Sequence, residues 1–207
     1  MPKLKPIILV TLFLSSTAVA QVSPPINAGA LDSFQVRYFA NLTAGDGAIN
    51  ITNVGFLGGT DPTGDICANV YVFAQSQQLA ACCSCPLTPN HLRTLSVQKD
   101  LTNNLLTPGL PTAITVAIVA TAESGGTCNA ASIQSTQLVS GLRAWGTTLH
   151  ALPGGGYTVG ETEFSPSPLS ASEFAKLTSY CGFIQAIGSG YGQCYSCVDG
   201  AEGAAKQ

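Results

Sequence analysis

Three of the eight cysteines lie within four residues of one another, in the stretch Ala80-Ala81-Cys82-Cys83-Ser84-Cys85. Side chains alternate between the two faces of a β-strand. If this stretch is a strand, Cys83 and Cys85 share one face and Cys82 points to the other. Cysteine-rich strands of this kind are typical of oxidising compartments, where eight cysteines form up to four disulfides.

The run 66–73 is expected to form a hairpin with the cysteine-rich strand 79–85. Two registers are open, one placing Cys67 opposite Cys85 and the other placing it opposite Cys83. Directly opposed residues of an antiparallel pair have Cα atoms about 4.5–5.5 Å apart, within the range of a disulfide. The hairpin therefore predicts a bond from Cys67 to Cys83 or Cys85.

The remaining cysteines need partners from elsewhere in the chain. The sequence predicts Cys128 with Cys181, and predicts bonds from the rest of the cluster to Cys194 and Cys197 in the C-terminal tail. Four thiolates in C-x-C and C-x2-C spacing are also a conceivable zinc site. That zinc set consists of Cys83, Cys85, Cys194 and Cys197. Export favours disulfides, so we expect no metal and no cofactor.

The N-terminus has the three parts of a secretory signal peptide. Lys3 and Lys5 form a positive region, 7–14 is almost wholly apolar, and Ala18-Val19-Ala20 is an A-x-A cleavage signal. The apolar run is too short to span a bilayer, which takes about 20 residues. We expect residues 1–20 to be removed and the protein to be secreted or periplasmic, with no membrane span.

The chain is poor in charge, with 9% charged residues and a formal net charge of −3. Nucleic-acid binding needs a basic face, which this composition does not supply. The same balance argues against anionic membrane surfaces. The surface is thus expected to be built from Ser, Thr, Asn, Gln and Gly, which suits an extracellular protein whose solubility does not depend on charge.

Short alternating runs separated by turns predict a mainly β fold, a β-sandwich or small barrel of about eight short strands. The expected organisation is an extended N-terminal arm (21–33), the sandwich (34–164), and a C-terminal helix with a cysteine-containing tail (165–207) packed on it. The runs 34–42 and 48–54 flank a Gly-Asp-Gly turn and are expected to pair as a hairpin.

The periodicity changes after the last strand. Ser170 and Glu173 form a capping box, and Leu169 with Phe174 forms the matching hydrophobic staple. These signals predict a helix over 171–186 with one apolar face.

Few residues point to catalysis. His91 and His150 are the only histidines, and there is no Gly-x-Ser-x-Gly nucleophile elbow. Both histidines are expected to be ordinary surface or hydrogen-bonded residues. We therefore expect no catalytic residue.

The acidic residues include two close pairs. Glu161 and Glu163 share a face of one strand, and paired carboxylates are what a glycoside hydrolase uses. Asp61 and Asp65 flank a turn and are conceivable calcium ligands. A solvated strand face and ordinary turn chemistry account for the two pairs more simply.

Trp145 is the only tryptophan. It is either a core residue, as one tryptophan in a sandwich commonly is, or an exposed stacking platform for sugars. The core reading is favoured.

Four stretches of the chain resemble a group of uncharacterised secreted bacterial proteins. They are ANLTAGDG (40–47), ACCSC (81–85), AWGTTLH (144–150) and YGQCYSC (191–197). The resemblance implies a bacterial exported protein and transfers no activity and no site residue.

These observations favour an exported, non-enzymatic structural or interaction protein of the cell surface, matrix or envelope, with a protein or glycan partner. The alternative is a carbohydrate-binding module, which needs Trp145 and tyrosines on an exposed face. The third reading is a secreted hydrolase, which needs His91 or His150 beside an acidic residue and a serine.

The first prediction concerns processing. The exported protein should begin at Gln21, either free or cyclised to pyroglutamate, because cleavage follows Ala20. N-terminal mass mapping of the exported protein checks this. Recovery of a peptide that still contains Lys3 would contradict it.

Overall fold

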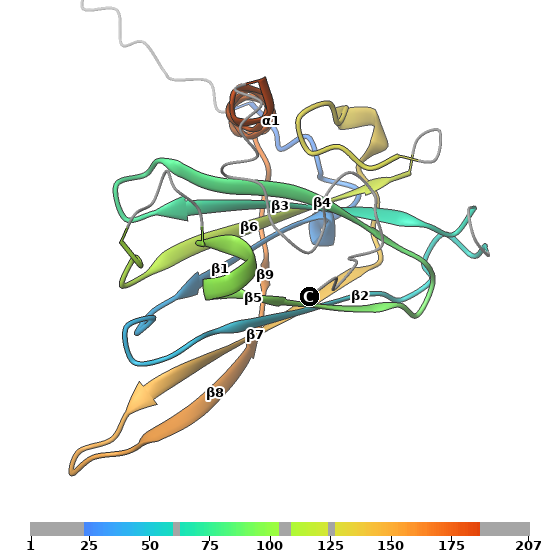
Figure 1. The fold of residues 1–207 in the computed structure, drawn as a ribbon. Helices are drawn as coiled ribbons and strands as arrows, with labels where there is room; N and C mark the ends of the chain where they lie inside the picture. Colours follow the sequence, from blue (N-terminus) through green and yellow to red (C-terminus); the bar gives the residue numbers. More distant parts are fainter. Residues whose placement is uncertain (1–22, 60–62, 104–108, 124–126, 187–207) are drawn as a thin grey trace, which may run out of the picture.

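The computed structural model describes residues 23–59, 63–103, 109–123 and 127–186. Two antiparallel sheets pack face to face (Figure 1). Sheet A contains, in spatial order, β4 (Leu79–Leu87), β3 (Ile66–Ala74), β6 (Ile114–Ala122), β1 (Phe34–Phe39) and β9 (Ser165–Pro166). Sheet B contains β5 (Leu92–Ser96), β2 (Ala48–Asn53), β7 (Leu142–Ala151) and β8 (Tyr157–Glu163). The mainly β sandwich is confirmed, and its two separate sheets exclude the small barrel.

The expected hairpin between the first two strands is wrong, because β1 and β2 belong to different sheets. β1 pairs with β6 and β9, whereas β2 pairs with β5 and β7. The connection between them is bonded to segments that flank the two sheets. The Leu42 amide donates to the carbonyl of Thr112, just before β6, at 3.1 Å, and the Asp46 carboxylate accepts from the amide of Gln98, just after β5, at 2.8 Å. The turn therefore carries the chain across the sandwich instead of closing a hairpin.

The sandwich interior is filled by the inward residues of both sheets. Alternate residues of β2 are buried, as are alternate residues of β7 up to Thr148. This is the pattern of strands with one face in a core. The largest side chains of this interior are Phe39, Leu42, Ile49, Ile51, Ile66, Leu87, Leu95, Leu101, Ile114, Ile118 and Phe164.

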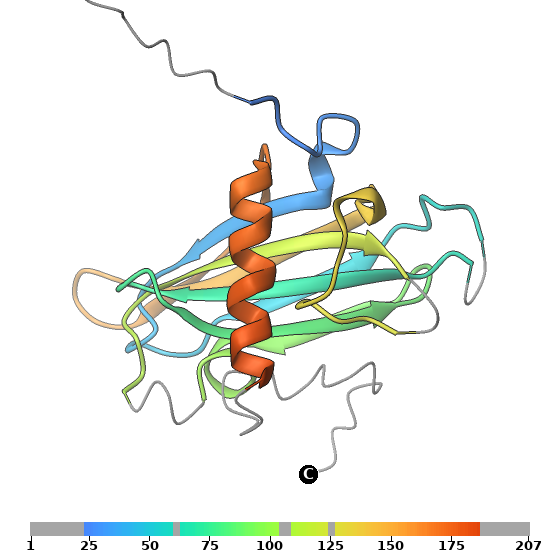
Figure 2. The same ribbon diagram turned by 90° about the horizontal axis from the view of Figure 1, so that it is seen from above.

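Helix α1 (Ala171–Ala186) runs across the strands on the outer face of sheet A (Figure 2). Its bounds confirm the sequence prediction. The Ser170 hydroxyl accepts from the Glu173 amide at 3.1 Å, as the capping signal required. Leu177, Cys181 and Ile184 are buried in a second apolar cluster between the helix and the sheet. Within the described residues, no helix is long and apolar enough to cross a membrane.

An irregularity between Val72 and Phe73 sets the register of the cysteine-rich strand. Phe73 lies opposite Leu79, but beyond the irregularity Cys67 lies opposite Pro86. One extra residue in a strand moves every later side chain to the other face. As a result Cys83 and Cys85 point into the sandwich, while Cys82 lies in the helix-side cluster.

The predicted bond from Cys67 to Cys83 or Cys85 is therefore wrong. Cys67 bonds to Cys128, with Cα atoms 5.5 Å apart. Cys82 bonds to Cys181 of α1, with Cα atoms 5.8 Å apart, so the predicted Cys128–Cys181 pair is wrong as well. Both errors have the same reason. Cys67 and Cys82 lie on the helix side of sheet A, whereas Cys83 and Cys85 point into the sandwich interior.

Cys83 and Cys85 are also disulfide-bonded, and none of the described cysteines is free. Cys194 and Cys197 lie outside the described residues. The predicted links from the cluster to the tail therefore stay a prediction.

The N-terminal arm is less extended than expected. Residues 27–30 form a turn, and Leu31–Ser33 form a 3₁₀ helix (η1). The Asn27 side chain accepts from the Leu169 amide at 2.8 Å and donates to the Ser167 carbonyl at 3.0 Å. This side chain, which a sequence pattern does not reveal, joins the arm to the connector that precedes α1.

The remaining short elements lie in connections. A π-helical turn (η2, Val97–Leu101) follows β5, and a 3₁₀ turn (η3, Ser135–Gln137) precedes β7.

The second prediction tests this sulfur arrangement. Digestion without reductant should yield Cys67–Cys128 and Cys82–Cys181 peptides, and should join Cys83 and Cys85 to Cys194 and Cys197. Replacing both Cys82 and Cys181 by alanine should lower the free energy of unfolding by about 2–5 kcal/mol, because the unfolded chain gains freedom. A Cys67–Cys83 or Cys67–Cys85 peptide would contradict the register of β3 and β4.

Candidate functional site: the β7–β8 hairpin

The hairpin of β7 and β8 extends beyond the rest of the two sheets (Figure 1). β8 is the edge strand of sheet B, and all of its residues are exposed except Gly160, which is half-buried. The sandwich therefore covers neither face of β8. A seven-residue strand presented in this way is unusual, since proteins normally shorten, cover or twist their sheet edges.

Two hydrogen bonds identify which groups of β8 face outward. At one end of the hairpin the Leu152 amide donates to the Gly156 carbonyl at 3.1 Å, and at the other the Phe164 amide donates to the Ala144 carbonyl at 2.8 Å. Hydrogen-bonded pairs alternate along an antiparallel ladder. Even-numbered residues of β8 thus bond to β7. The odd-numbered residues direct their main-chain N–H and C=O groups to the free edge: Tyr157, Val159, Glu161 and Glu163.

Phe164 anchors the base of the hairpin. It is 1% exposed, and its ring centroid lies 6.0 Å from that of Phe39 on β1. The next two residues form β9 and pair with β1. The chain thus leaves sheet B and enters sheet A within two residues, which holds the hairpin against both sheets.

Arg37 supports the hairpin from inside the sandwich. Its Nε donates to the Thr162 hydroxyl at 2.9 Å, and its guanidinium carbon lies 4.2 Å from the centroid of the Phe39 ring. Gly146 makes room for it, because a Cβ on Gly146 would lie 2.4 Å from Arg37 Nη1. Burial lowers the pKa of the Arg37 guanidinium, and the Glu161 carboxylate raises it in part.

The outer face of sheet B brings together several residues that the sequence singled out. Trp145 lies between Asn50 on β2 and Glu163 on β8. The side-chain nitrogen of Asn50 lies 3.5 Å from Glu161 Oε1, and the side-chain oxygen of Asn50 accepts from the Thr94 hydroxyl at 2.8 Å. A polar row therefore crosses the sheet beside the tryptophan.

The core reading of Trp145 is wrong, since this residue is half-buried and lies outside both apolar clusters. The inward positions of β7 are occupied by Ala144 and Gly146, because the buried Arg37 leaves no room for a large side chain there. Alternation then turns Trp145 to the outer face.

Glu161 and Glu163 share the exposed outer face of β8, as the alternation predicted. His150 lies on the opposite, inner face, with its Nε2 3.3 Å from the Thr148 hydroxyl. His91 lies in a turn, where its amide donates to the Thr88 carbonyl at 3.0 Å. The structure does not bring the two histidines together.

Asp65 is buried at the start of β3, whereas Asp61 lies outside the described residues. The calcium reading of this pair therefore stays untested. Among the described residues, no three side chains of His, Cys, Asp and Glu are grouped so as to hold a metal ion.

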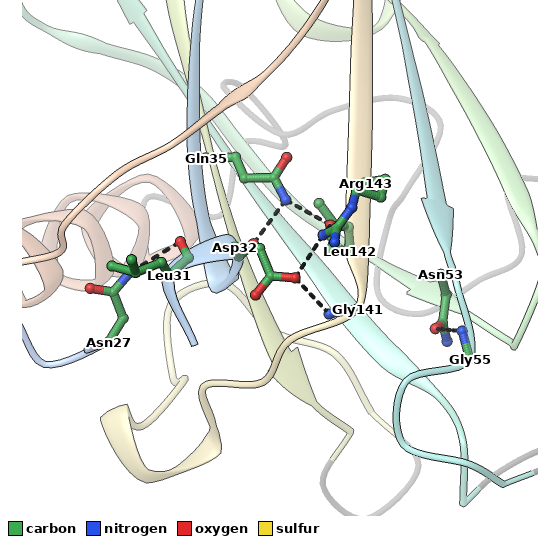
Figure 3. A network of polar contacts seen from close by, with 9 residues as sticks. All are labelled: Asn27, Leu31, Asp32, Gln35, Asn53, Gly55, Gly141, Leu142 and Arg143. Carbon is green, nitrogen blue, oxygen red and sulfur yellow. Dashed lines mark hydrogen bonds and ion pairs between the residues drawn. The ribbon is translucent and has the colours of Figure 1, made fainter. Parts of the chain in front are cut away.

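Sequence reasoning did not find the polar network at the other end of the sandwich (Figure 3). Asp32 accepts from Arg143 at 2.6 Å and from the Gly141 amide at 3.1 Å. The buried Gln35 donates to the Leu142 carbonyl at 2.7 Å. These bonds tie η1 and β1 to the start of β7, so the hairpin is held at its far end as well.

Burial alone would raise the pKa of Asp32. Hydrogen bonds from Ser140, Arg143 and the Gly141 amide, with the charge of Arg143, outweigh burial and hold this pKa below its usual range. The carboxylate is therefore more stable in the folded chain than in the unfolded chain.

Comparisons with protein-family models, curated proteins and solved structures found no match for this chain. The function has to be inferred from the residues themselves.

The third prediction follows from Asp32. Its stabilising contribution should be present above about pH 4, the ordinary carboxyl range, and should be lost as the pH falls through its lowered folded-state pKa. Asp32→Asn should cost about 1–2 kcal/mol at neutral pH, with the difference from wild type vanishing in acid. Urea unfolding at several pH values measures this.

Glu163→Gln on the exposed hairpin is the control and should leave the unfolding curves unchanged. If Asp32→Asn unfolds like wild type at neutral pH, the network does not hold the two sheets.

Proposed function

We propose that the protein is an exported, non-enzymatic structural or interaction protein of the cell surface, matrix or envelope, and that the free edge of β8 is its contact surface. The observation that carries the proposal is a seven-residue edge strand, open on both faces and held at its base by Phe164 and Arg37. An unpaired edge is a template for an added strand. The disulfides support the exported location, because such bonds persist in oxidising compartments.

The partner strand that fits best is β8 of a second copy. With Gly160 at a two-fold axis, antiparallel pairing places Val159 opposite Glu161 of the second copy and Tyr157 opposite Glu163 of the second copy. Both pairs join residues whose main-chain groups face the free edge, so the hydrogen-bonding pattern is satisfied on both copies. Thr158 then lies opposite Thr162 of the second copy, and threonine pairs are favourable cross-strand neighbours.

This register also keeps the glutamate side chains of the two copies from lying directly opposite each other. No carboxylate lies directly opposite another, which is the arrangement that costs most. The four glutamates of the two copies still share one face of the joined sheet. Self-association should therefore strengthen as salt screens their repulsion.

The fourth prediction tests the edge directly. Val159→Pro removes an outward N–H group and leaves the bonds from β8 to β7 in place. The variant should stay folded and lose self-association at least tenfold. Val159→Thr, which keeps both the N–H and the β-branched shape, is the matched control and should associate like wild type.

Sedimentation equilibrium over a range of protein and salt concentrations measures these differences. A wild-type protein that stays monomeric at the highest concentration in high salt would overturn pairing through β8. Equal association of Val159→Pro and wild type would show that copies meet elsewhere.

A further inference from the structure

A groove lies on the opposite sheet from the hairpin, between α1 and the outer face of sheet A. Its volume is about 440 Å³, which lies within the range of small-ligand sites. Its floor is a row across three neighbouring strands, with Tyr38 of β1 and Phe73 of β3 on either side of Thr115 of β6. The wall is the α1 face that carries Glu173, Lys176 and Tyr180.

Two of the three aromatic residues of the groove are exposed to solvent, and the third, Phe73, is half-buried against the helix-side cluster. Tyr38 is 61% exposed and Tyr180 is 45% exposed, although both adjoin the helix-side core. In the next row of the same sheet face, under the helix, Tyr71 is fully buried. The helix thus covers one row and leaves the row of Tyr38 as a platform.

The spacing of the floor suits a ring-sized unit. Tyr38 and Phe73 are two strands apart, which is about 10 Å at the usual strand separation. A flat ligand unit therefore fits over Thr115, with aromatic surface on both sides. A tyrosine ring offers an apolar face and a hydroxyl group at its tip, which matches a molecule with apolar faces and polar rims.

The charges of the groove compensate each other. Lys176 Nζ lies 2.5 Å from the Glu173 carboxylate and 5.7 Å from the centroid of the Phe73 ring. Lys176 and Glu173 are the two charged residues that line the groove, so its formal charge sums to zero. The remaining polar lining consists of amides and hydroxyls, which bind hydroxyl groups without a charge requirement.

The β3–β4 turn brings these amides to the groove. Gln75 and Gln77 line it from the turn, and the Thr112 hydroxyl donates to the Gln75 amide oxygen at 3.1 Å. Gln77 has a φ of 67°, a left-handed backbone that is uncommon for residues other than glycine, asparagine and aspartate. The Gln77 amide donates to the Ala74 carbonyl at 2.9 Å, so this conformation belongs to the tight turn that joins β3 to β4.

We propose that this groove binds a neutral saccharide chain, with Tyr38 and Tyr180 stacking on sugar rings and Gln75 and Gln77 bonding to hydroxyls. A peptide suits the site less well, because the floor is a sheet face and offers no main-chain edge for strand addition. The site goes beyond the contact surface proposed at β8 and does not depend on it.

The test uses the full oxidised protein and isothermal titration calorimetry with neutral oligosaccharides: cellohexaose, xylohexaose and mannohexaose. At least one should bind. Tyr38→Ala and Tyr180→Ala should each weaken that binding about tenfold, since a ring contact is lost. Tyr38→Phe keeps the ring and should bind within a few-fold of wild type.

Tyr157→Ala is the matched control, since Tyr157 is 55% exposed but lies on β8, far from the groove. It should bind like wild type. The Val159→Pro variant should also keep saccharide binding, and Tyr38→Ala should keep self-association, so the two proposals fail separately.

Three results would overturn the proposal. One is the absence of binding to every neutral oligosaccharide at millimolar concentration. Another is tighter binding of oligogalacturonate, which would show a charged ligand. The third is an equal loss of binding in Tyr157→Ala.

Discussion

The structure depends on the alternation of side chains along one edge strand. β4 places Cys83 and Cys85 inside the sandwich and Cys82 on the outer face, where Cys82 bonds to Cys181 of α1. Within the described residues α1 is the one α-helix, and its ion pair, between Glu173 and Lys176, lies within the helix itself. The Cys82–Cys181 bond fixes the helix across the middle of sheet A, and the apolar cluster of Leu177 and Ile184 then forms beneath it.

The position of the helix determines which part of sheet A stays open. Because Cys181 lies above β4, the preceding turns of α1 pass over the row of Tyr71 and leave the row of Tyr38 uncovered. The groove therefore lies beside a helix that both the disulfide and the helix-side apolar cluster hold in place. The β7–β8 hairpin has a separate origin, since sheet B extends past sheet A and is supported by Arg37 and Phe164. The two surfaces lie on different sheets and are held by different interactions.

The parts of the fold that local signals encode were predicted from the sequence. The helix bounds followed from Ser170 and its capping geometry, and most strands followed from alternation. The register of β3 and β4 did not, because the extra residue Ala80, between Leu79 and Ala81, puts Cys82 instead of Cys83 and Cys85 on the face of Cys67. The groove could not be predicted from the sequence for a different reason. Tyr38, Phe73 and Tyr180 come from three elements that are neighbours only because of the strand order, and no local sequence pattern encodes that order.

The low charge of the chain is consistent with the kinds of contact that the two proposed surfaces offer. The described ion pairs, Asp32 with Arg143 and Glu173 with Lys176, are compensated within the molecule, and Arg37 is buried against Phe39. The surfaces proposed for partners are the main-chain edge of β8, which carries the exposed Glu161 and Glu163, and the aromatic faces beside α1. The contacts beside α1 depend on apolar area and uncharged hydrogen bonds and should tolerate changes in salt, whereas pairing through β8 should strengthen as salt screens the repulsion between glutamates.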